Sequence, residues 1–325
     1  MASKAGLFPV GFVTFAAVRL TWRACTFQGL SPPFLLVLAS VLMNHFSLRR
    51  CIAACVVLSL VLSANRAQAE GLQYPLTAVS SPDGKTLFIA DLNQPGVWKL
   101  SEGKLSLFFQ ASKKFRTPLN RIRCMALDHQ GKLLAGDSST REVYRFDDEG
   151  KPQPLTEGGI GIPMDLVDDG QGNIFVTDLE LHWIWKIAAG AKKAEKFAEV
   201  AAPHGITIDS DKNLWVVSHG KNQLVKVTPE AKVEVVVEGR PFQFPHEIEL
   251  GKDKTAYVTD GYGKCVWKIP PGGKPAKLVE GEPLKNPVGL TWQGETLLVI
   301  DPHSKGVFSV GTDGKLSPVA ASLEK

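Results

Sequence analysis

One motif recurs six times between residues 87 and 310, and this repeat limits the possible folds more than any other feature of the chain. Each copy is an apolar strand, a short loop and a second strand, and in five copies the first strand ends in Asp. Position four of the series has Ser218 instead. Successive copies follow one another at intervals of roughly 40 residues. The copies are LFIADLNQPGVWKL (87–100), LLAGDSSTREVYRF (133–146), IFVTDLELHWIWKI (174–187), LWVVSHGKNQLVKV (214–227), AYVTDGYGKCVWKI (256–269) and LLVIDPHSKGVFSV (297–310).

A period near 40 residues with about four short strands per unit is typical of a propeller blade, because one four-stranded sheet cannot bury both of its faces alone. The sequence therefore predicts an all-β, six-bladed β-propeller of four-stranded antiparallel blades. We expect the last blade to form its outer strand from residues 315–320, and no N-terminal strand to close the ring. The predicted blades span residues 72–113, 114–158, 159–200, 201–239, 240–281 and 282–325.

The segment 1–69 differs from the rest of the chain, because it holds six Lys or Arg and the first acidic residue is Glu70. Arg49 and Arg50 precede the apolar run 51–64 and the small-residue site 67–69, which together form the pattern of a secretory signal peptide. A second possible start, Met43, predicts a mis-assigned start for 1–42, a signal peptide over 43–69 and a mature propeller over 70–325. We therefore expect an exported protein, periplasmic or extracellular, that touches the membrane only if its leader stays uncleaved.

Charge and cysteine content argue against a nucleic-acid-binding protein and against a disulfide-stabilised one. Residues 70–325 carry 31 basic and 33 acidic side chains, a net charge of −2, so no nucleic-acid partner is predicted. Cys124 and Cys265 fall in the second and fifth blades, which lie opposite one another in a six-fold ring. No disulfide is expected between them.

The recurring Asp is the most visible polar feature, and its regular spacing predicts a structural role. A carboxylate at a strand end accepts hydrogen bonds from backbone N–H groups of nearby turns. A residue present in nearly every blade is expected to build the blade, and Ser218 is expected to replace one such bond. The five copies are Asp91, Asp137, Asp178, Asp260 and Asp301.

Side chains that do not recur are better candidates for function. The innermost strands of a propeller line its central channel, so the residues that open them meet at one mouth. These segments are 75–77, 122–124, 163–165, 203–205, 245–247 and 287–289, and they contain Arg123, Asp165, His204, His246 and Glu247. Imidazole and carboxylate groups suit Zn²⁺ or a related divalent ion, Ca²⁺ being the other possibility. Three further histidines, His182, His219 and His303, follow second strands and are predicted to be structural or surface residues.

Two segments, Pro163–Ile187 and Pro203–Val227, have the order proline, apolar strand, Asp, a turn with Asn, a second strand and Lys, which resembles the NHL repeat. Similar six-bladed rings occur in the regucalcin and gluconolactonase family and in the peptidylglycine amidating lyase. That lyase holds zinc with three histidines in Pro-His motifs, and the resemblance implies His204 and His246 as the two matching ligands here.

Two functions follow from this pattern. The first is a non-enzymatic exported binding scaffold, whose channel mouth and inter-blade loops hold a ligand or protein partner. The alternative is a metal-dependent hydrolase or lyase acting on a small molecule, lactonase-like or amidating-lyase-like. In that case His204 and His246 would bind the metal, Asp165 or Glu247 would act as ligand or general base, and Arg123 would bind an anionic substrate group.

Overall fold

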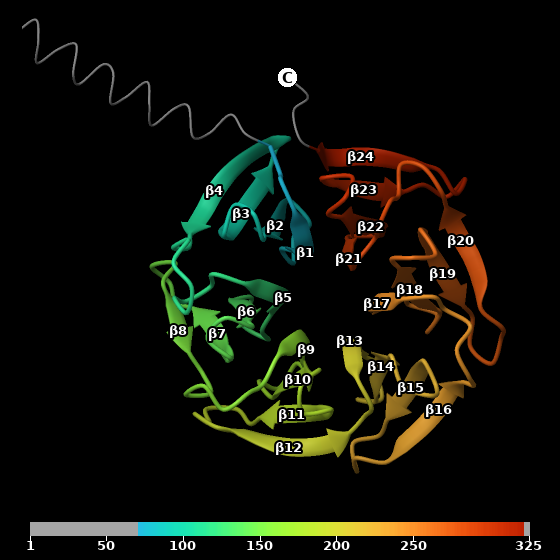
Figure 1. The fold of residues 1–325 in the computed structure, drawn as a ribbon, viewed down its shortest axis with the longest axis horizontal. Helices are drawn as coiled ribbons and strands as arrows, with labels where there is room; N and C mark the ends of the chain where they lie inside the picture. The colour runs from blue at the N-terminus through green and yellow to red at the C-terminus, as the bar shows by residue number, and fades with distance from the viewer. Residues whose placement is uncertain (1–70, 322–325) are drawn as a thin grey trace, which may run out of the picture. The chain divides into compact units, whose positions relative to one another are not determined.

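A computed structural model describes residues 71–321, which form twenty-four strands in six four-stranded antiparallel sheets around a central axis (Figure 1). Each sheet takes four consecutive strands, and all lie within the predicted blade limits, so the six-bladed propeller is confirmed. The strands are β1 (Pro75–Ser80), β2 (Thr86–Asp91), β3 (Gly96–Ser101), β4 (Lys104–Gln110); β5 (Ile122–Leu127), β6 (Leu133–Asp137), β7 (Glu142–Phe146), β8 (Pro152–Pro154); β9 (Pro163–Asp168), β10 (Ile174–Asp178), β11 (Trp183–Ile187), β12 (Ala194–Glu199); β13 (Pro203–Ile208), β14 (Leu214–Ser218), β15 (Leu224–Val227), β16 (Val233–Val237); β17 (Pro245–Leu250), β18 (Ala256–Asp260), β19 (Cys265–Ile269), β20 (Ala276–Glu280); β21 (Gly289–Gln293), β22 (Thr296–Asp301), β23 (Gly306–Val310) and β24 (Leu316–Ala321).

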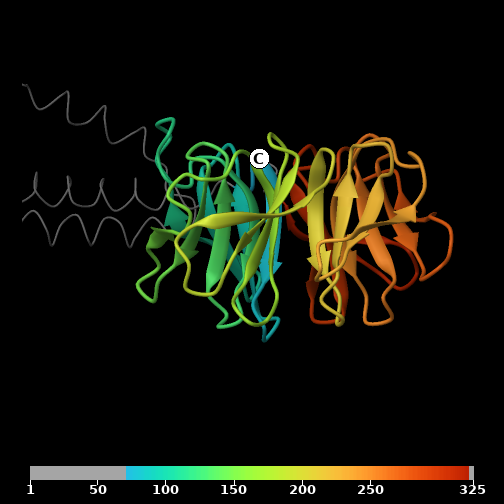
Figure 2. The same cartoon turned by 90° about the horizontal axis from the view of Figure 1, so that it is seen from below.

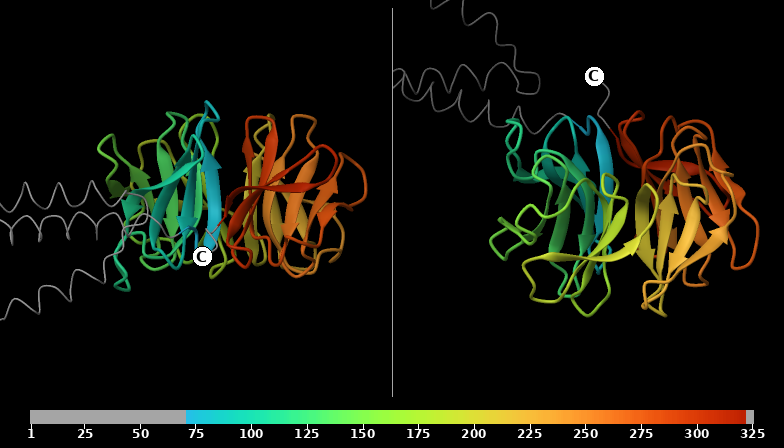
Figure 3. Two further views of the ribbon diagram at one scale, coloured as in Figure 1. Left: turned by 90° about the horizontal axis from the view of Figure 1, so that it is seen from above. Right: turned by 60° about the horizontal axis from the view of Figure 1, so that its bottom comes forward.

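The hydrophobic core lies between the blades rather than within one sheet. Phe175 and Ile184 of the third blade pack with Val216 of the fourth, and Ile89 of the first packs with Ile300 of the sixth. Burying each such side chain stabilises the fold by about 1.5–3 kcal/mol. This stabilisation is gained only when neighbouring blades stack on one another. Figures 2 and 3 show the inner strands of the blades running along the axis, with the outer strands strongly tilted across it and loops at both ends.

The recurring Asp is a structural clamp, as predicted. The carboxylate of Asp178 accepts the backbone N–H groups of Gly161 and Ile162 at 2.8 and 3.0 Å, and of the second and third residues after itself at 3.0 and 3.1 Å. It also accepts the indole N–H of Trp185 at 2.8 Å. The side chain is fully buried. It therefore fixes the loop that leads into the inner strand β9, and with it one sector of the channel mouth.

Ser218 replaces this clamp in the fourth blade, as the sequence predicts. Its hydroxyl donates to the Ala201 carbonyl at 2.6 Å and accepts the Gly220 N–H at 2.9 Å. The loop before β13 is thus still tied to the end of β14, but by fewer bonds than in the other blades.

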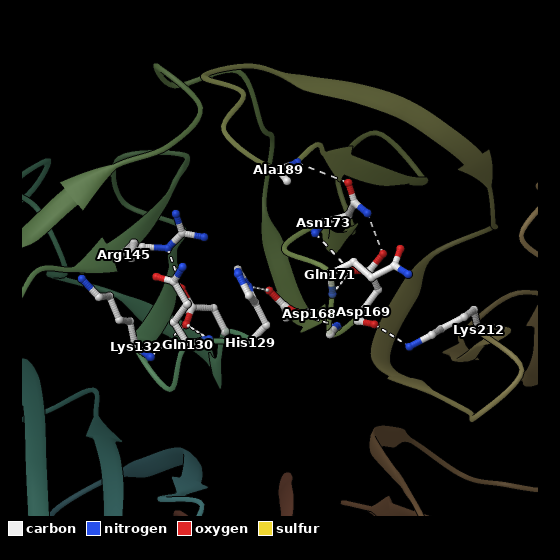
Figure 4. A network of polar contacts seen from close by, with 12 residues as sticks. His129, Gln130, Lys132, Arg145, Asp168, Asp169, Gln171, Asn173, Ala189 and Lys212 are labelled. Carbon is white, nitrogen blue, oxygen red and sulfur yellow. Dashed lines mark hydrogen bonds and ion pairs between the residues drawn. The ribbon is translucent and has the colours of Figure 1, made fainter.

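Polar contacts link neighbouring blades at the end of the channel opposite the mouth (Figure 4). The Asp169 carboxylate accepts the Asn173 amide at 2.7 Å and so shapes the turn between β9 and β10. On one side of this turn His129 lies 3.4 Å from Asp168, and on the other Lys212 donates to the Asp169 carbonyl at 2.6 Å. These contacts join the second, third and fourth blades.

The ring closes between the first and sixth blades without exchange of a strand among residues 71–321. The outer strand β24 pairs with β23 of its own blade, as predicted. Across the junction, the Gln293 amide donates to the Gly84 carbonyl at 2.8 Å. Side-chain packing and contacts such as this hydrogen bond therefore hold the junction together.

The predicted leader lies outside the described residues. This applies to the mis-assigned start, to the signal peptide and to the cleavage site at residues 67–69. Within residues 71–321, no helix is long and apolar enough to cross a membrane. Cys124 and Cys265 are both buried free thiols, so the predicted absence of a disulfide between them is confirmed.

Candidate functional site

A cavity of about 380 Å³ opens at the end of the axis where the inner strands begin. The middle residue of each predicted three-residue opening lines it, so the prediction that these positions share one mouth is confirmed. Those six residues are Leu76, Arg123, Met164, His204, His246 and Val288, and the remaining wall is formed by Ile162, Leu179, His219, Phe244 and Glu247. All six blades therefore contribute to one site.

Three imidazoles form one side of the mouth. His204 is the second residue of β13 and His246 the second residue of β17, and their ring centres are 5.5 Å apart. His219, from the loop after β14, stacks on His204 with ring centres 4.0 Å apart and an interplanar angle of 18°. Thr177 donates its hydroxyl to the His204 carbonyl at 2.5 Å, which ties β13 to the neighbouring blade.

His219 was predicted to be a structural or surface residue, but it lines the cavity. Its Nε2 donates to the Pro245 carbonyl at 2.6 Å, and Arg240 donates to the carbonyls of His219 and Gly220, the latter at 2.7 Å. These bonds turn the loop inward. One signal was available, because His219 directly follows the single break in the Asp repeat. Of the other two histidines placed with it, His303 is exposed and lies 3.4 Å from the Tyr74 hydroxyl, outside the cavity.

The three imidazoles are neutral at physiological pH. Burial, followed by the neighbouring imidazoles, lowers the pKa of His204 to about 2 and that of His246 to about 4. Burial also lowers the pKa of His219. Desolvation disfavours the charged form of a base, which accounts for the direction. Each ring therefore offers one N–H donor and one acceptor nitrogen.

Arg123 faces the cavity from the second blade. Its Nε donates to the Ser138 hydroxyl at 3.3 Å, and it forms no ion pair within residues 71–321. Burial and then the nearby Arg121 lower the pKa of the guanidinium, although arginine stays charged in proteins. The mouth thus contains a half-buried positive charge without a carboxylate partner.

A carboxyl pair lies at the base of the mouth. Glu247 lines the cavity and hydrogen-bonds to Asp165, which is buried behind the wall and accepts the Ile206 N–H at 2.7 Å. Burial raises the pKa of Asp165 to about 6, and burial together with the Asp165 charge raises that of Glu247 well above its usual value. The two carboxyl groups therefore hold a proton more readily than exposed carboxyls would.

Gly205 allows this pair to form. A Cβ at this position would lie 2.7 Å from the Glu247 Cα and from the His246 carbonyl oxygen. Only glycine lets β13 approach β17 this closely, because the atoms that an added Cβ would meet belong to the backbone and cannot rotate away.

Among residues 71–321, no group of three or more His, Cys, Asp or Glu is arranged to hold a metal ion.

Glu249, two positions after Glu247 on the same strand, predicts a pH effect on stability. Burial and the Asp165 charge raise its pKa to about 8, against an ordinary value of 4.5. Between these values the folded chain keeps a proton that the unfolded chain releases, so stability falls as pH rises towards 8. The lowered pKa values of the three histidines make stability rise with pH instead, but only below their unfolded pKa of about 6.5.

We therefore expect the free energy of unfolding to fall between pH 6.5 and 8, and Glu249→Gln to flatten this decline and stabilise the protein at pH 8. Urea unfolding at the two pH values measures it. Glu295→Gln serves as the control, because that exposed carboxylate pairs with Lys252. Identical slopes for Glu249→Gln and the unmodified protein would contradict the expectation.

Comparison with known proteins shows similarity in structure only. No family model and no curated protein matches the sequence. Among solved structures, virginiamycin B lyase from Staphylococcus aureus is similar with a TM-score of 0.60 at 15% identity, over 76% of this chain and 86% of that one. A gluconolactonase from Xanthomonas campestris gives 0.61 at 15%, over 72% and 85%, and a nidogen/laminin complex gives 0.58 at 16%, over 76% and 90%. At these identities the likeness shows the propeller fold alone.

Proposed function

We propose that the chain is exported and that its propeller is a binding protein that takes a small anionic molecule at the channel mouth. Arg123 carries this proposal. It is the only positively charged side chain lining the cavity, since the three imidazoles are neutral there, and it has no anionic partner among residues 71–321.

A half-buried guanidinium without a counter-charge is costly, and a carboxylate or phosphate on a ligand would compensate it with two parallel hydrogen bonds. The single carboxyl group on the wall, Glu247, does not take this role, because it hydrogen-bonds to Asp165 and burial raises its pKa well above the usual value. Aliphatic side chains around the mouth would cover the apolar body of such a ligand.

The surrounding structure supports binding by a preformed site. Inner strands carry Arg123, His204 and His246, and buried Asp clamps fix the loops that precede most of these strands. Little conformational entropy is then lost when a ligand enters. The blades are NHL repeats in this proposal, because the Asp178 clamp and the turn with Asn173 within Pro163–Ile187 match that motif.

Calorimetric titration with cyclohexanecarboxylate, a compact apolar anion, tests the site. Arg123→Gln should weaken binding by about 10- to 100-fold, the effect of losing a charged hydrogen bond worth about 1.5–3 kcal/mol. Arg121→Gln is the matched control, because it removes an exposed charge from the same segment. Equal affinities for the two variants would contradict the proposal. N-terminal sequencing of the exported protein should give Glu70 as its first residue.

A metal-dependent hydrolase or lyase is the second candidate. One observation favours it: His204 and His246 are neutral and adjacent, so both keep a nitrogen lone pair for an ion such as Zn²⁺. The structurally similar lyase and gluconolactonase are enzymes built on this fold, which hosts many functions.

Elemental analysis separates the two candidates. For an enzyme of this kind, the purified protein would hold stoichiometric metal that a His204→Ala, His246→Ala double variant loses. Our leading proposal predicts no such metal, even after incubation with excess Zn²⁺ and Ca²⁺.

A further inference from the structure

Aromatic rings gather on one wall of the mouth. All four rings that line the cavity come from the fourth and fifth blades, whereas the lining side chains of the other four blades are not aromatic. Tyr262 stacks on Phe244 with ring centres 4.7 Å apart, and Phe244 lies 4.4 Å from His219 and 4.9 Å from His246. With His204 behind His219, these rings form a continuous series from the rim to the interior.

Tyr262 extends this wall beyond the cavity. Its side chain is 67% exposed, the most of any large apolar or aromatic residue among those described, and it lies between Gly261 and Gly263. Stacking against Phe244 covers one face of its ring and leaves the other open to solvent. Aromatic rings pack favourably with centre distances of about 4.5–7 Å. The open face and the ring edges therefore form a surface for a flat aromatic group.

His204 adds a polar group that a ligand can reach. Its side chain is only 6% exposed, it lines the cavity, and its ring nitrogens make no hydrogen bond within residues 71–321. The ring nitrogens are open to the cavity rather than enclosed by protein. A neutral imidazole has one donor and one acceptor, and a hydroxyl group can satisfy either of them. A hydroxyl group on a ligand in the cavity can therefore replace water on one of these nitrogens.

We infer that the anionic molecule bound at the mouth is an aromatic carboxylate bearing a hydroxyl group. This inference rests on the proposed function, since it assigns the carboxylate to Arg123. The ring lies against the aromatic wall formed by Phe244 and Tyr262, and the hydroxyl hydrogen-bonds to His204.

Three probes of similar size test the inference: cyclohexanecarboxylate, benzoate and 4-hydroxybenzoate. In the unmodified protein, affinity should rise in this order, by about threefold to tenfold at each step. Tyr262→Leu should weaken benzoate by about fivefold and change cyclohexanecarboxylate by less than twofold. His204→Phe keeps a ring in place, and it should abolish the gain from the hydroxyl group.

The control is Phe115→Leu, which alters an aromatic side chain that is 62% exposed and does not line the mouth. If the unmodified protein bound all three probes with equal affinity, and Arg123→Gln lost that binding, the inference would be overturned while the proposed anion site would be supported. Absence of binding by every probe would overturn both. The comparison of probes in the unmodified protein needs no variant, so misfolding of a variant does not blur the result.

Discussion

Replacing Asp178 by alanine is expected to lower the free energy of unfolding by about 4 kcal/mol, because several buried donors lose their acceptor together. The fully buried carboxylate accepts four backbone N–H groups and the indole N–H of Trp185. Alanine would leave these donors without an acceptor, and each buried donor without a partner costs about 1–3 kcal/mol unless water reaches it. Chemical denaturation with fluorescence detection measures the loss.

The fourth blade provides the internal comparison for this experiment. Ser218→Ala occupies the same position of the repeat but removes only two hydrogen bonds, so it should cost about 1 kcal/mol. Asp178→Asn keeps one acceptor oxygen and should fall between the two. If Asp178→Ala were no more damaging than Ser218→Ala, the clamp would not be what holds the loop.

Gly205→Ala is the second change with a large expected effect. The added Cβ would meet the backbone of β17 at 2.7–2.8 Å, closer than real contacts of this kind. Because neither strand can give way by a side-chain rotation, β13 and β17 must separate, at a cost of about 2–3 kcal/mol. Separation would also part Glu247 from Asp165. We therefore expect lower stability together with weaker cyclohexanecarboxylate binding, measured by denaturation and calorimetry.

Gly190→Ala is the control for the loss of glycine itself. Gly190 has a φ of 73° and no atom within 4 Å of an added Cβ, so only backbone strain of about 1 kcal/mol is expected. Unchanged binding in Gly205→Ala would show that close approach of β13 and β17 does not shape the mouth.

Sequence alone was sufficient for the fold because blade formation depends on local features. Alternating apolar residues, turns and the spaced Asp all lie within a single repeat, and the same features return in each blade. Their phase also identifies the start of every inner strand, so Arg123, His204, His246 and Glu247 could be assigned to one mouth. Asp165 was assigned there too, but the structure places it behind the wall, where it bonds to Glu247 and to the Ile206 N–H.

The contacts between blades were decided only by the tertiary structure. His219 enters the site because its loop is bonded to Pro245 and Arg240 of the next blade, and no pattern within one repeat encodes that direction. Gly205 similarly acts through the adjacent strand β17. Repetition of local chemistry thus determined six blades and their phase. Side-chain direction, ionisation and close backbone approach depend instead on neighbours a whole repeat away in the sequence, which meet only when the ring is closed.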